Sequence, residues 1–148
     1  MGEATLRCLV GRGAHHVLVA NRSYTHAESL AGQVGGRAVP ADDLPEALRA
    51  ADILICSTAA DRYVLTKSHM QILMRQRRQR PFFLIDISVP RNLDPAIGTL
   101  DNVYLYNIDD LEGMAAANLQ RRAGELGPCL DLIEQQARRF EARLAQVS

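Results

Sequence analysis

Short apolar segments alternate with amphipathic segments along this chain, and the apolar ones are rich in β-branched residues. They occupy residues 16–20 (HVLVA), 38–39 (AV), 53–57 (ILICS), 82–87 (FFLIDI) and 103–106 (VYLY). Strands of a parallel sheet covered on both faces are apolar almost throughout, so this pattern predicts five parallel strands joined by helices. The predicted fold class is α/β, a Rossmann-like parallel sheet followed by a long C-terminal helix.

Helices are predicted over residues 2–11, 25–34, 45–51 and 66–78. The helix over 25–34 has the clearest ends. Thr25 and Glu28 have the spacing of a capping box, and the Gly35-Gly36 pair supplies a left-handed stop. We therefore expect Thr25 to be the N-cap of this helix.

The tail of the chain carries a heptad pattern. Apolar residues alternate at spacings of four and three, at Leu119, Ala123, Leu126, Leu130, Ile133, Ala137, Phe140 and Leu144. This spacing predicts a helix that packs lengthwise against a partner helix. Proline removes a helical hydrogen bond and clashes with the preceding turn, so Gly127-Pro128 predicts a kink or a break. We place a Rossmann-like domain at residues 1–112 and a helical region that packs against a partner at 113–148.

Composition indicates a folded protein without a strong global charge. Hydrophobic residues make up 47% of the 148 positions, and 17 basic residues balance 17 acidic ones, so the net field favours neither nucleic acid nor an anionic membrane. No apolar run approaches the roughly 20 residues that span a bilayer, and the N-terminus is no secretory signal. Cys8, Cys56 and Cys129 match no metal-ligand spacing. We expect reduced thiols, no metal site, no membrane contact and a cytoplasmic location.

Polar residues follow the predicted strands. They are Asn21-Arg22-Ser23, Ser57-Thr58, Asp86 with Ser88, and Asn107 with Asp109-Asp110. Ligands of open parallel sheets bind beyond the carboxyl ends of the strands, so the four groups together predict a binding site there. Each group taken alone is better explained as an ordinary polar turn.

Arg22 carries the sharpest inference about the ligand. In NAD-binding folds an acidic residue follows the second strand, about 20 residues after the glycine loop, and binds the ribose hydroxyls. Here that place, counted from Gly2, holds Asn21 and Arg22. An arginine there accommodates a 2′-phosphate, so NADP is favoured over NAD; the alternative is a solvated loop arginine.

The helix beginning at Gly2 has the position to present its amides to a pyrophosphate. A complete fingerprint also needs a strand and two further glycines before it, and this sequence contains neither. The predicted sheet therefore lacks the strand that normally occupies its centre.

Other reactive side chains have simpler explanations. Cys56 lies within an apolar strand and is expected to be a small buried core residue, not a nucleophile. The four histidines have no partner at metal or triad spacing. The basic run 75–80 ends a helix, where positive charge complements the dipole and water solvates the rest; an RNA-binding patch is the alternative. No catalytic residue is assigned.

Several segments also match a known family. They are Met1-Gly2-Glu3, Ala20-Asn21-Arg22-Ser23, Ala51-Asp52-Ile53, Ser57-Thr58-Ala59, residues 86–91 (DISVPR) and residues 103–111 (VYLYNIDDL), followed by Asn118-Leu119 and the long helix. With these segments the chain resembles the NADPH-binding domain and the start of the dimerisation helix of glutamyl-tRNA reductase. The Asn-Arg-Ser turn also occurs in shikimate dehydrogenase-like folds, whereas DISVPR and YNIDDL are more specific.

The resemblance implies an activity. In that family a cysteine of an N-terminal domain attacks the ester of glutamyl-tRNA, and NADPH reduces the resulting thioester to glutamate-1-semialdehyde, the first step of tetrapyrrole (porphyrin and heme) biosynthesis. This chain would be the NADPH-binding portion, inactive alone. Glutamyl-tRNA would bind through domains absent from this sequence, and the C-terminal helix would form a homodimer. A shikimate dehydrogenase-like NADP-binding domain and a non-catalytic helical interaction module are the alternatives.

The resemblance also assigns site residues by position. Gly2 would border the pyrophosphate of NADPH, and Asn21, Arg22 and Ser23 would hold the adenosine phosphate. Ser57, Thr58 and Ala59 would line the cofactor cleft. The nicotinamide side of the cleft would be shaped by Asp86, Ser88, Val89 and Pro90.

Overall fold

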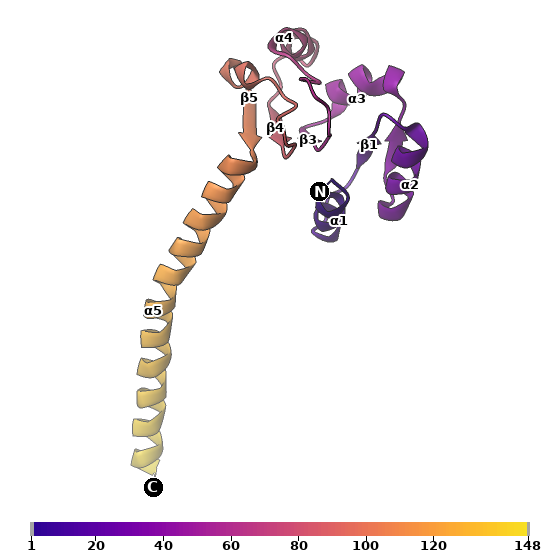
Figure 1. Ribbon diagram of the computed structural model, residues 1–148. Coiled ribbons are helices and arrows are strands. Elements are labelled where there is room, and N and C mark those ends of the chain that lie inside the picture. Colours follow the sequence, from indigo (N-terminus) through magenta and orange to yellow (C-terminus); the bar gives the residue numbers. More distant parts are fainter. Residues whose placement is uncertain (1, 148) are drawn as a thin grey trace. The chain divides into compact units, whose positions relative to one another are not determined.

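The computed structural model describes the backbone of residues 2–147 and the side chains of residues 2–143. Its elements are α1 (Gly2–Gly11), β1 (Leu18–Ala20), α2 (Tyr24–Val34), β2 (Arg37–Val39), the 3-10 helix η1 (Ala41–Asp43), α3 (Leu44–Ala50), β3 (Ile53–Cys56), α4 (Lys67–Gln76), β4 (Phe82–Asp86), the 3-10 helix η2 (Pro95–Thr99), β5 (Val103–Asn107) and α5 (Ile108–Val147) (Figure 1). The chain forms two compact units, one ending at Ile108 and the other beginning at Asp109. The predicted α/β alternation is confirmed.

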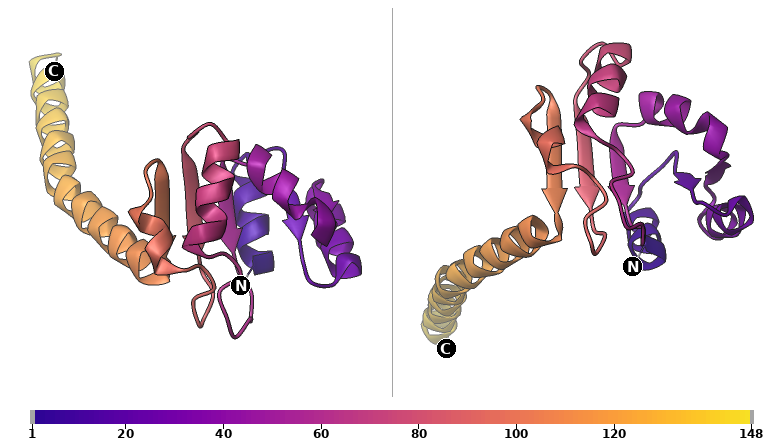
Figure 2. Two further views of the ribbon diagram at one scale, coloured as in Figure 1. Left: turned by 90° about the horizontal axis from the view of Figure 1, so that it is seen from above. Right: turned by 45° about the horizontal axis from the view of Figure 1, so that its top comes forward.

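The strands of the first unit form two parallel sheets. β1 pairs with β2, with Val19 opposite Ala38, and β3, β4 and β5 form a second sheet in that order. Figure 2 shows the β1–β2 pair drawn apart from the larger sheet. Within the described residues, β1 and β3 each therefore keep one edge without a strand partner, as expected for a sheet that lacks its central strand.

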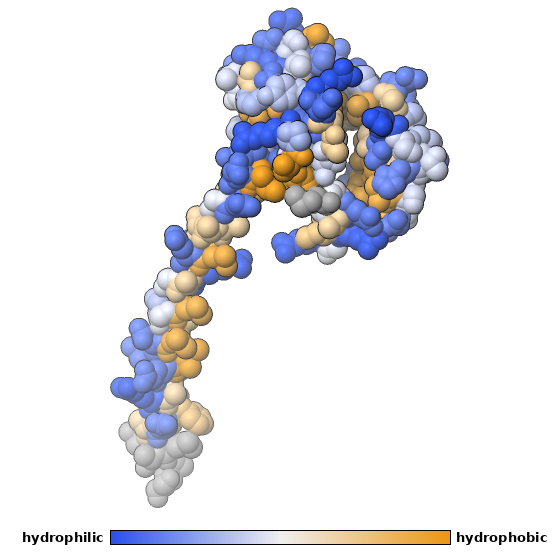
Figure 3. All heavy atoms as spheres, in the orientation of Figure 1, coloured by the Kyte–Doolittle hydropathy of each residue, from blue (hydrophilic) through white to orange (hydrophobic). Residues whose placement is uncertain are grey.

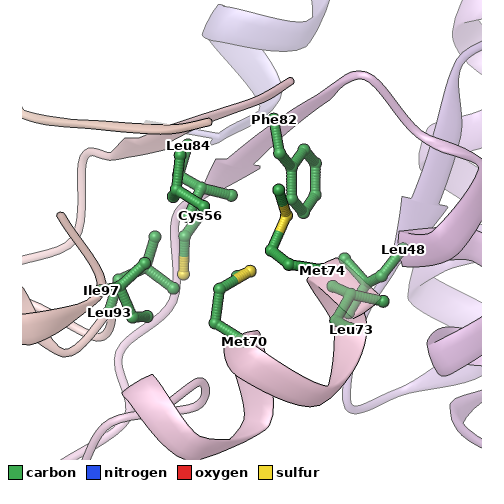
Figure 4. Close-up of a cluster of buried hydrophobic side chains, with 10 residues drawn as sticks. Leu48, Cys56, Met70, Leu73, Met74, Phe82, Leu84, Leu93 and Ile97 are labelled. Atoms are coloured by element: carbon green, nitrogen blue, oxygen red, sulfur yellow. The ribbon is translucent and has the colours of Figure 1, made fainter. Parts of the chain in front are cut away.

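The main core lies between α4 and one face of the larger sheet. Met70, Leu73 and Met74 recur at helical spacing, so they share the face of α4 that packs on Phe82 and Leu84 (Figure 4). Phe82, Leu84 and Met70 are fully buried. This cluster anchors β3 and β4, whose carboxyl ends carry the candidate site residues.

The opposite face of that sheet is open in this structure. The strand register aligns Ile53, Phe83 and Tyr104 in one row across β3, β4 and β5. All three are exposed, and the rings of Phe83 and Tyr104 stack with centroids 4.8 Å apart. Helix α1 likewise has no buried residue. The sequence pattern of strands buried on both faces is therefore satisfied on one face only.

The start of α2 differs from the expectation. Ser23, and not Thr25, is the N-cap: its backbone is extended, and its Oγ accepts the His26 amide hydrogen bond at 3.4 Å. Thr25 already lies inside the helix, so its side chain cannot cap the first turn. The predicted stop is confirmed, because Gly35 adopts a left-handed φ of 66°.

Gly36 is required by a close backbone contact. A Cβ at this position would lie 2.9 Å from the Val17 carbonyl oxygen, which accepts the Arg37 amide at the start of β2. Upstream, His16 has a φ of 56°, so β1 begins at Leu18 and the predicted strand was too long at its N-terminal end.

Helix α5 is continuous through Pro128, so of the predicted kink or break, the break is wrong. The carbonyl with which a helical proline ring clashes, four residues earlier, belongs here to Gly124. Leu119, Leu126, Leu130, Ile133 and Phe140 are each more than 60% exposed. They form the apolar stripe along α5 that Figure 3 shows in orange. None of the described helices is both long and apolar enough to cross a membrane.

The basic run at the end of α4 is solvated only in part, contrary to expectation. Arg77 is 5% exposed, and its guanidinium lies 4.1 Å from the ring centroid of Phe82. It donates hydrogen bonds to the carbonyl oxygens of Leu48 and Arg49, each at 2.8 Å, and of Pro81 at 3.2 Å. The side chain therefore satisfies unpaired carbonyls at the end of α3.

Candidate functional site

The N-terminus of α1 lies at the carboxyl end of β3. A Cβ added to Gly2 would stand 3.2 Å from both Cβ and Oγ of Ser57, the residue that follows β3. Only a residue without a side chain fits here without displacing Ser57. Two of the predicted site positions, far apart in the sequence, are thus neighbours, and the start of α1, with the free amides of a helix N-terminus, lies at this edge of the sheet.

The turn after β1 is fixed by its own side chains. The Asn21 Oδ1 accepts the Ser23 amide hydrogen bond at 2.9 Å, and Ser23 caps α2. Arg22, between them, is exposed and makes no hydrogen bond or ion pair within the part of the chain that the structure describes. The turn therefore presents a guanidinium with its donors available to a ligand.

Arg22 faces the loop that follows β3 across a hollow of about 750 Å³. The lining residues are Arg22, Ala59, Ala60, Asp61, Arg62, Tyr63 and Val64. Two guanidiniums and one carboxylate give the hollow a net positive lining, and its volume lies within the range of small-molecule sites. Sequence reasoning identified Arg22 and Ala59 but missed Arg62 and Tyr63, which continue the same loop.

The loop after β3 is joined to the loop after β4. The Thr58 amide donates to the Ser88 Oγ at 3.1 Å, and the Thr58 hydroxyl donates to the Asn92 Oδ1. Asn92 is fully buried and was not identified from the sequence. These bonds bring together the groups predicted after the third and fourth strands.

Asp86 organises the second of these loops. It is 2% exposed; its Oδ1 accepts the Ser88 amide at 3.0 Å, and its Oδ2 accepts the amides of Asn92 and Leu93 at 2.8 Å each. Ser88 is itself buried, at 4% exposure, whereas Val89 is 77% exposed and Pro90 is also exposed. Asp86 and Ser88 therefore hold the backbone, and Val89 and Pro90 form the surface of the loop.

Cys56 lies beneath the site and is buried, as expected for a core residue. Burial raises the pKa of its thiol, and the Asp86 carboxylate adds to this, while a hydrogen bond from the Ser88 hydroxyl, 3.7 Å from Sγ, opposes it. A thiol kept protonated is a poor nucleophile. Its place in the structure gives Cys56 a packing role.

Asn107, predicted with the fourth strand-end group, lies at a smaller hollow of about 180 Å³. This hollow is lined by Asp86, Arg91, Leu93, Pro95, Gly98, Leu105 and Asn107. It is distinct in its lining from the Arg22 hollow, sharing none of its residues. Among the described residues no three histidine, cysteine or acidic side chains gather as a metal site.

The groups around the Arg22 hollow and the start of α1 suit a phosphorylated ligand. The turn after β1 offers a guanidinium, the start of α1 offers free amides beside Ser57, and the hollow between β1 and the loop after β3 has the volume for a nucleoside-sized group. The residues present thus fit a dinucleotide whose phosphates are bound by arginine and by a helix N-terminus.

A family model described as shikimate/quinate 5-dehydrogenase matches residues 1–114. The chain is 48% identical over 140 residues to the glutamyl-tRNA reductase of Syntrophotalea carbinolica and 45% identical over 145 residues to that of Bacillus mycoides. These matches cover 95% and 98% of this chain but 32% and 33% of the relatives, so the chain spans about a third of their length.

A solved structure, glutamyl-tRNA reductase from Methanopyrus kandleri, is similar to 99% of this chain and covers it with 37% of its own length. Its TM-score is 0.78 at 36% sequence identity. The resemblance inferred from the DISVPR and YNIDDL segments is thereby confirmed, and so is the fold.

Proposed function

We infer that this chain, which belongs to the family described as shikimate/quinate 5-dehydrogenase, is the NADPH-binding portion of a glutamyl-tRNA reductase. The assignment of NADPH as the cofactor rests on the position of Arg22. It stands where an NAD-binding fold has an acidic residue, and it lines a hollow with a second guanidinium, from Arg62. NADPH, when bound, supplies a hydride.

The roles of the site residues follow from their positions. Arg22, with the neighbouring side chains of Asn21 and Ser23, would hold the adenosine phosphate, and Gly2 would allow the pyrophosphate to approach the amides of α1. Ser57 and Thr58 would line the cleft next to Ala59, which lines the Arg22 hollow. For the rest of the cleft, Asp86 and Ser88 would fix the loop whose exposed part, Val89 and Pro90, bounds the nicotinamide end.

The whole protein would reduce glutamyl-tRNA to glutamate-1-semialdehyde, at the start of tetrapyrrole synthesis in the cytoplasm. Residues 1–112 would bind the cofactor and residues 113–148 would begin the dimerisation region. The relatives' names support this substrate, because those proteins are glutamyl-tRNA reductases. No catalytic residue is proposed in this chain, so glutamyl-tRNA turnover by the isolated 148-residue chain would contradict the assignment.

Cofactor choice is tested by replacing Arg22. In Arg22→Glu the phosphate loses a charge-assisted bond and meets a negative charge, so the Kd for NADPH should rise at least about tenfold while that for NADH changes little. Both Kd values are measured by titrating the protein and each cofactor together and following the intrinsic NAD(P)H fluorescence. Arg12→Glu, an equal change of charge at an exposed position after α1, is the control. An equal loss of both cofactors would refute the phosphate role.

Dimerisation is tested on the stripe of α5. Leu130 belongs to the heptad positions and Leu132 does not, although the two are 63% and 56% exposed. A buried charge at a heptad position disrupts a coiled coil, so Leu130→Glu should give monomers in sedimentation equilibrium, and Leu132→Glu should leave the dimer intact. A monomeric unmodified chain, or equal effects of the two changes, would contradict dimerisation through this stripe.

The family model favours a second candidate, an NADP-binding domain of shikimate dehydrogenase type, because it matches residues 1–114. The two glutamyl-tRNA reductases named above align over 140 and 145 residues and so include most of α5, which favours the first proposal. Binding of neither cofactor would instead favour a non-catalytic helical interaction module.

A further inference from the structure

Asn92, in the loop after β4, is hydrogen-bonded to the loop after β3, whose residues line the Arg22 hollow. Its side chain is fully buried, although asparagine is mostly found at protein surfaces. Its Nδ2 donates to the carbonyl oxygens of Ala60 at 2.8 Å and Arg62 at 3.2 Å, and its Oδ1 accepts from the Thr58 hydroxyl. All the hydrogen-bonding atoms of the amide are thus engaged with one segment, residues 58–62.

The same segment forms the wall of the hollow. Ala60, Arg62 and Val64 line it, and each is bonded to Asn92: the first two by their carbonyl oxygens, and Val64 by its amide, which donates to the Asn92 carbonyl oxygen at 2.7 Å. Hydrogen bonds to the peptide groups of Ala60, Arg62 and Val64 restrict the backbone of this segment, and therefore the directions in which its side chains leave the backbone. Asn92 thereby sets how Arg62 and Tyr63 are presented to the hollow.

Asn92 is itself held from behind. Its amide and that of Leu93 donate to the buried carboxylate of Asp86 at 2.8 Å, and Leu65 forms a parallel bridge with Leu93. The chain of bonds runs from the end of β4 through Asp86 and Asn92 to the wall of the hollow. Asparagine alone among the side chains of this size offers two donors and an acceptor in this arrangement.

We propose that Asn92 is a positioning residue for the cofactor site: it holds Ala60–Val64 in the shape that presents Arg62 and Tyr63 toward Arg22. The proposal rests on the proposed NADPH function. It assigns no contact between Asn92 and the ligand, since the side chain is buried behind the wall. Loss of Asn92 acts on binding through the conformation of residues 58–64.

The experiment compares Asn92→Ala with Ile97→Ala in the full chain. Ile97 is equally buried and belongs to the core, but it does not line the hollow, so its replacement supplies a loss of thermal stability without a change in the wall. Asn92→Ser, which keeps one hydroxyl donor, serves where Asn92→Ala does not fold. Three quantities are measured well below each Tm: amide hydrogen exchange of residues 58–65, the Kd for NADPH and the Kd for NADH.

The proposal predicts that Asn92→Ala raises the Kd for NADPH about tenfold and lowers the preference for NADPH over NADH, because the displaced wall carries Arg62. Amide exchange of residues 58–65 should accelerate with or without cofactor, and Asn92→Ser should lie between. Ile97→Ala should leave both properties unchanged. An equal rise of Kd in both alanine variants, or unchanged exchange in Asn92→Ala, would overturn the positioning role. If the unmodified chain binds no NADPH, the proposed function fails, and the exchange measurement still decides whether Asn92 fixes the wall.

Discussion

Replacing Asp86 by asparagine should destabilise the first unit strongly while keeping the shape of the side chain. The carboxylate accepts three backbone amides and is 2% exposed, so no water can replace a lost bond. With its single oxygen at the Oδ2 position, asparagine still accepts the hydrogen bonds from the Asn92 and Leu93 amides. Its NH₂ group then faces the Ser88 amide, which is also a donor. One acceptor is lost, and two charge-assisted bonds become neutral.

The magnitude follows from these three bonds. Hydrogen bonds to a charged group contribute about 1.5 to 3 kcal/mol and neutral ones about 1 kcal/mol, so losing one and weakening two amounts to about 2.5 to 7 kcal/mol. Folding free energies of domains are about 5 to 15 kcal/mol in all, so the change removes a large part of the stability. Urea unfolding followed by circular dichroism, with equal m values, measures the difference.

Asp94→Asn is the matched control. The Asp94 carboxylate also accepts two backbone amides, from Ala96 at 2.9 Å and Lys67 at 3.1 Å, but the residue is only half-buried. Asparagine keeps the capping bond from Ala96 almost as well as aspartate does, and water can reach the half-buried Lys67 amide that loses its acceptor, so a loss of only about 1 kcal/mol is expected. If Asp86→Asn costs no more than Asp94→Asn, the buried carboxylate does not hold the loop and the reasoning is wrong.

Two other substitutions test buried groups away from the ligand. Arg77→Met removes the donors that satisfy the carbonyls at the end of α3 and should cost about 3 kcal/mol or more in urea unfolding, whereas Arg75→Met, at an exposed position of α4, should change little. Equal costs would contradict a capping role for Arg77. Because burial raises the pKa of Cys56, the unfolded chain loses this proton first as the pH rises past about 8.5, so the unfolding free energy should fall from there up to the folded-state pKa. In Cys56→Ala, unfolded by urea under reducing conditions at pH 7.5 and pH 10, that part of the pH dependence should vanish; an unchanged dependence would be the contrary result.

Regular features of the fold were predictable because they depend on local patterns. Apolar runs located all five strands, and Gly35 located the end of α2 through its left-handed backbone. Local patterns were less decisive where two candidates were adjacent. Ser23 and Thr25 are both good N-caps, and the choice depended on which of them kept an extended backbone.

Features that depend on distant partners were not predictable. Arg77 belongs to a basic run of the kind found at solvated helix ends, and its burial depends on carbonyls 26 to 29 residues away in the sequence. Asn92 bonds to Ala60 and Thr58, 32 and 34 residues earlier. Composition and periodicity carry no signal for such pairs. The candidate site was therefore predictable at its strand ends, where topology brings residues together, but not in the side chains that support it.

The division of the strands into two sheets has a consequence for cooperativity. No ladder hydrogen bond connects β1 and β2 with β3, β4 and β5, so the described strands can open in two steps with separate free energies. Arg22 follows the smaller sheet and Ala59 follows the larger one, and both line the same hollow. A ligand bound there would contact residues of both sheets and so connect them. Its binding free energy would then stabilise both sheets at once and turn two opening transitions into one.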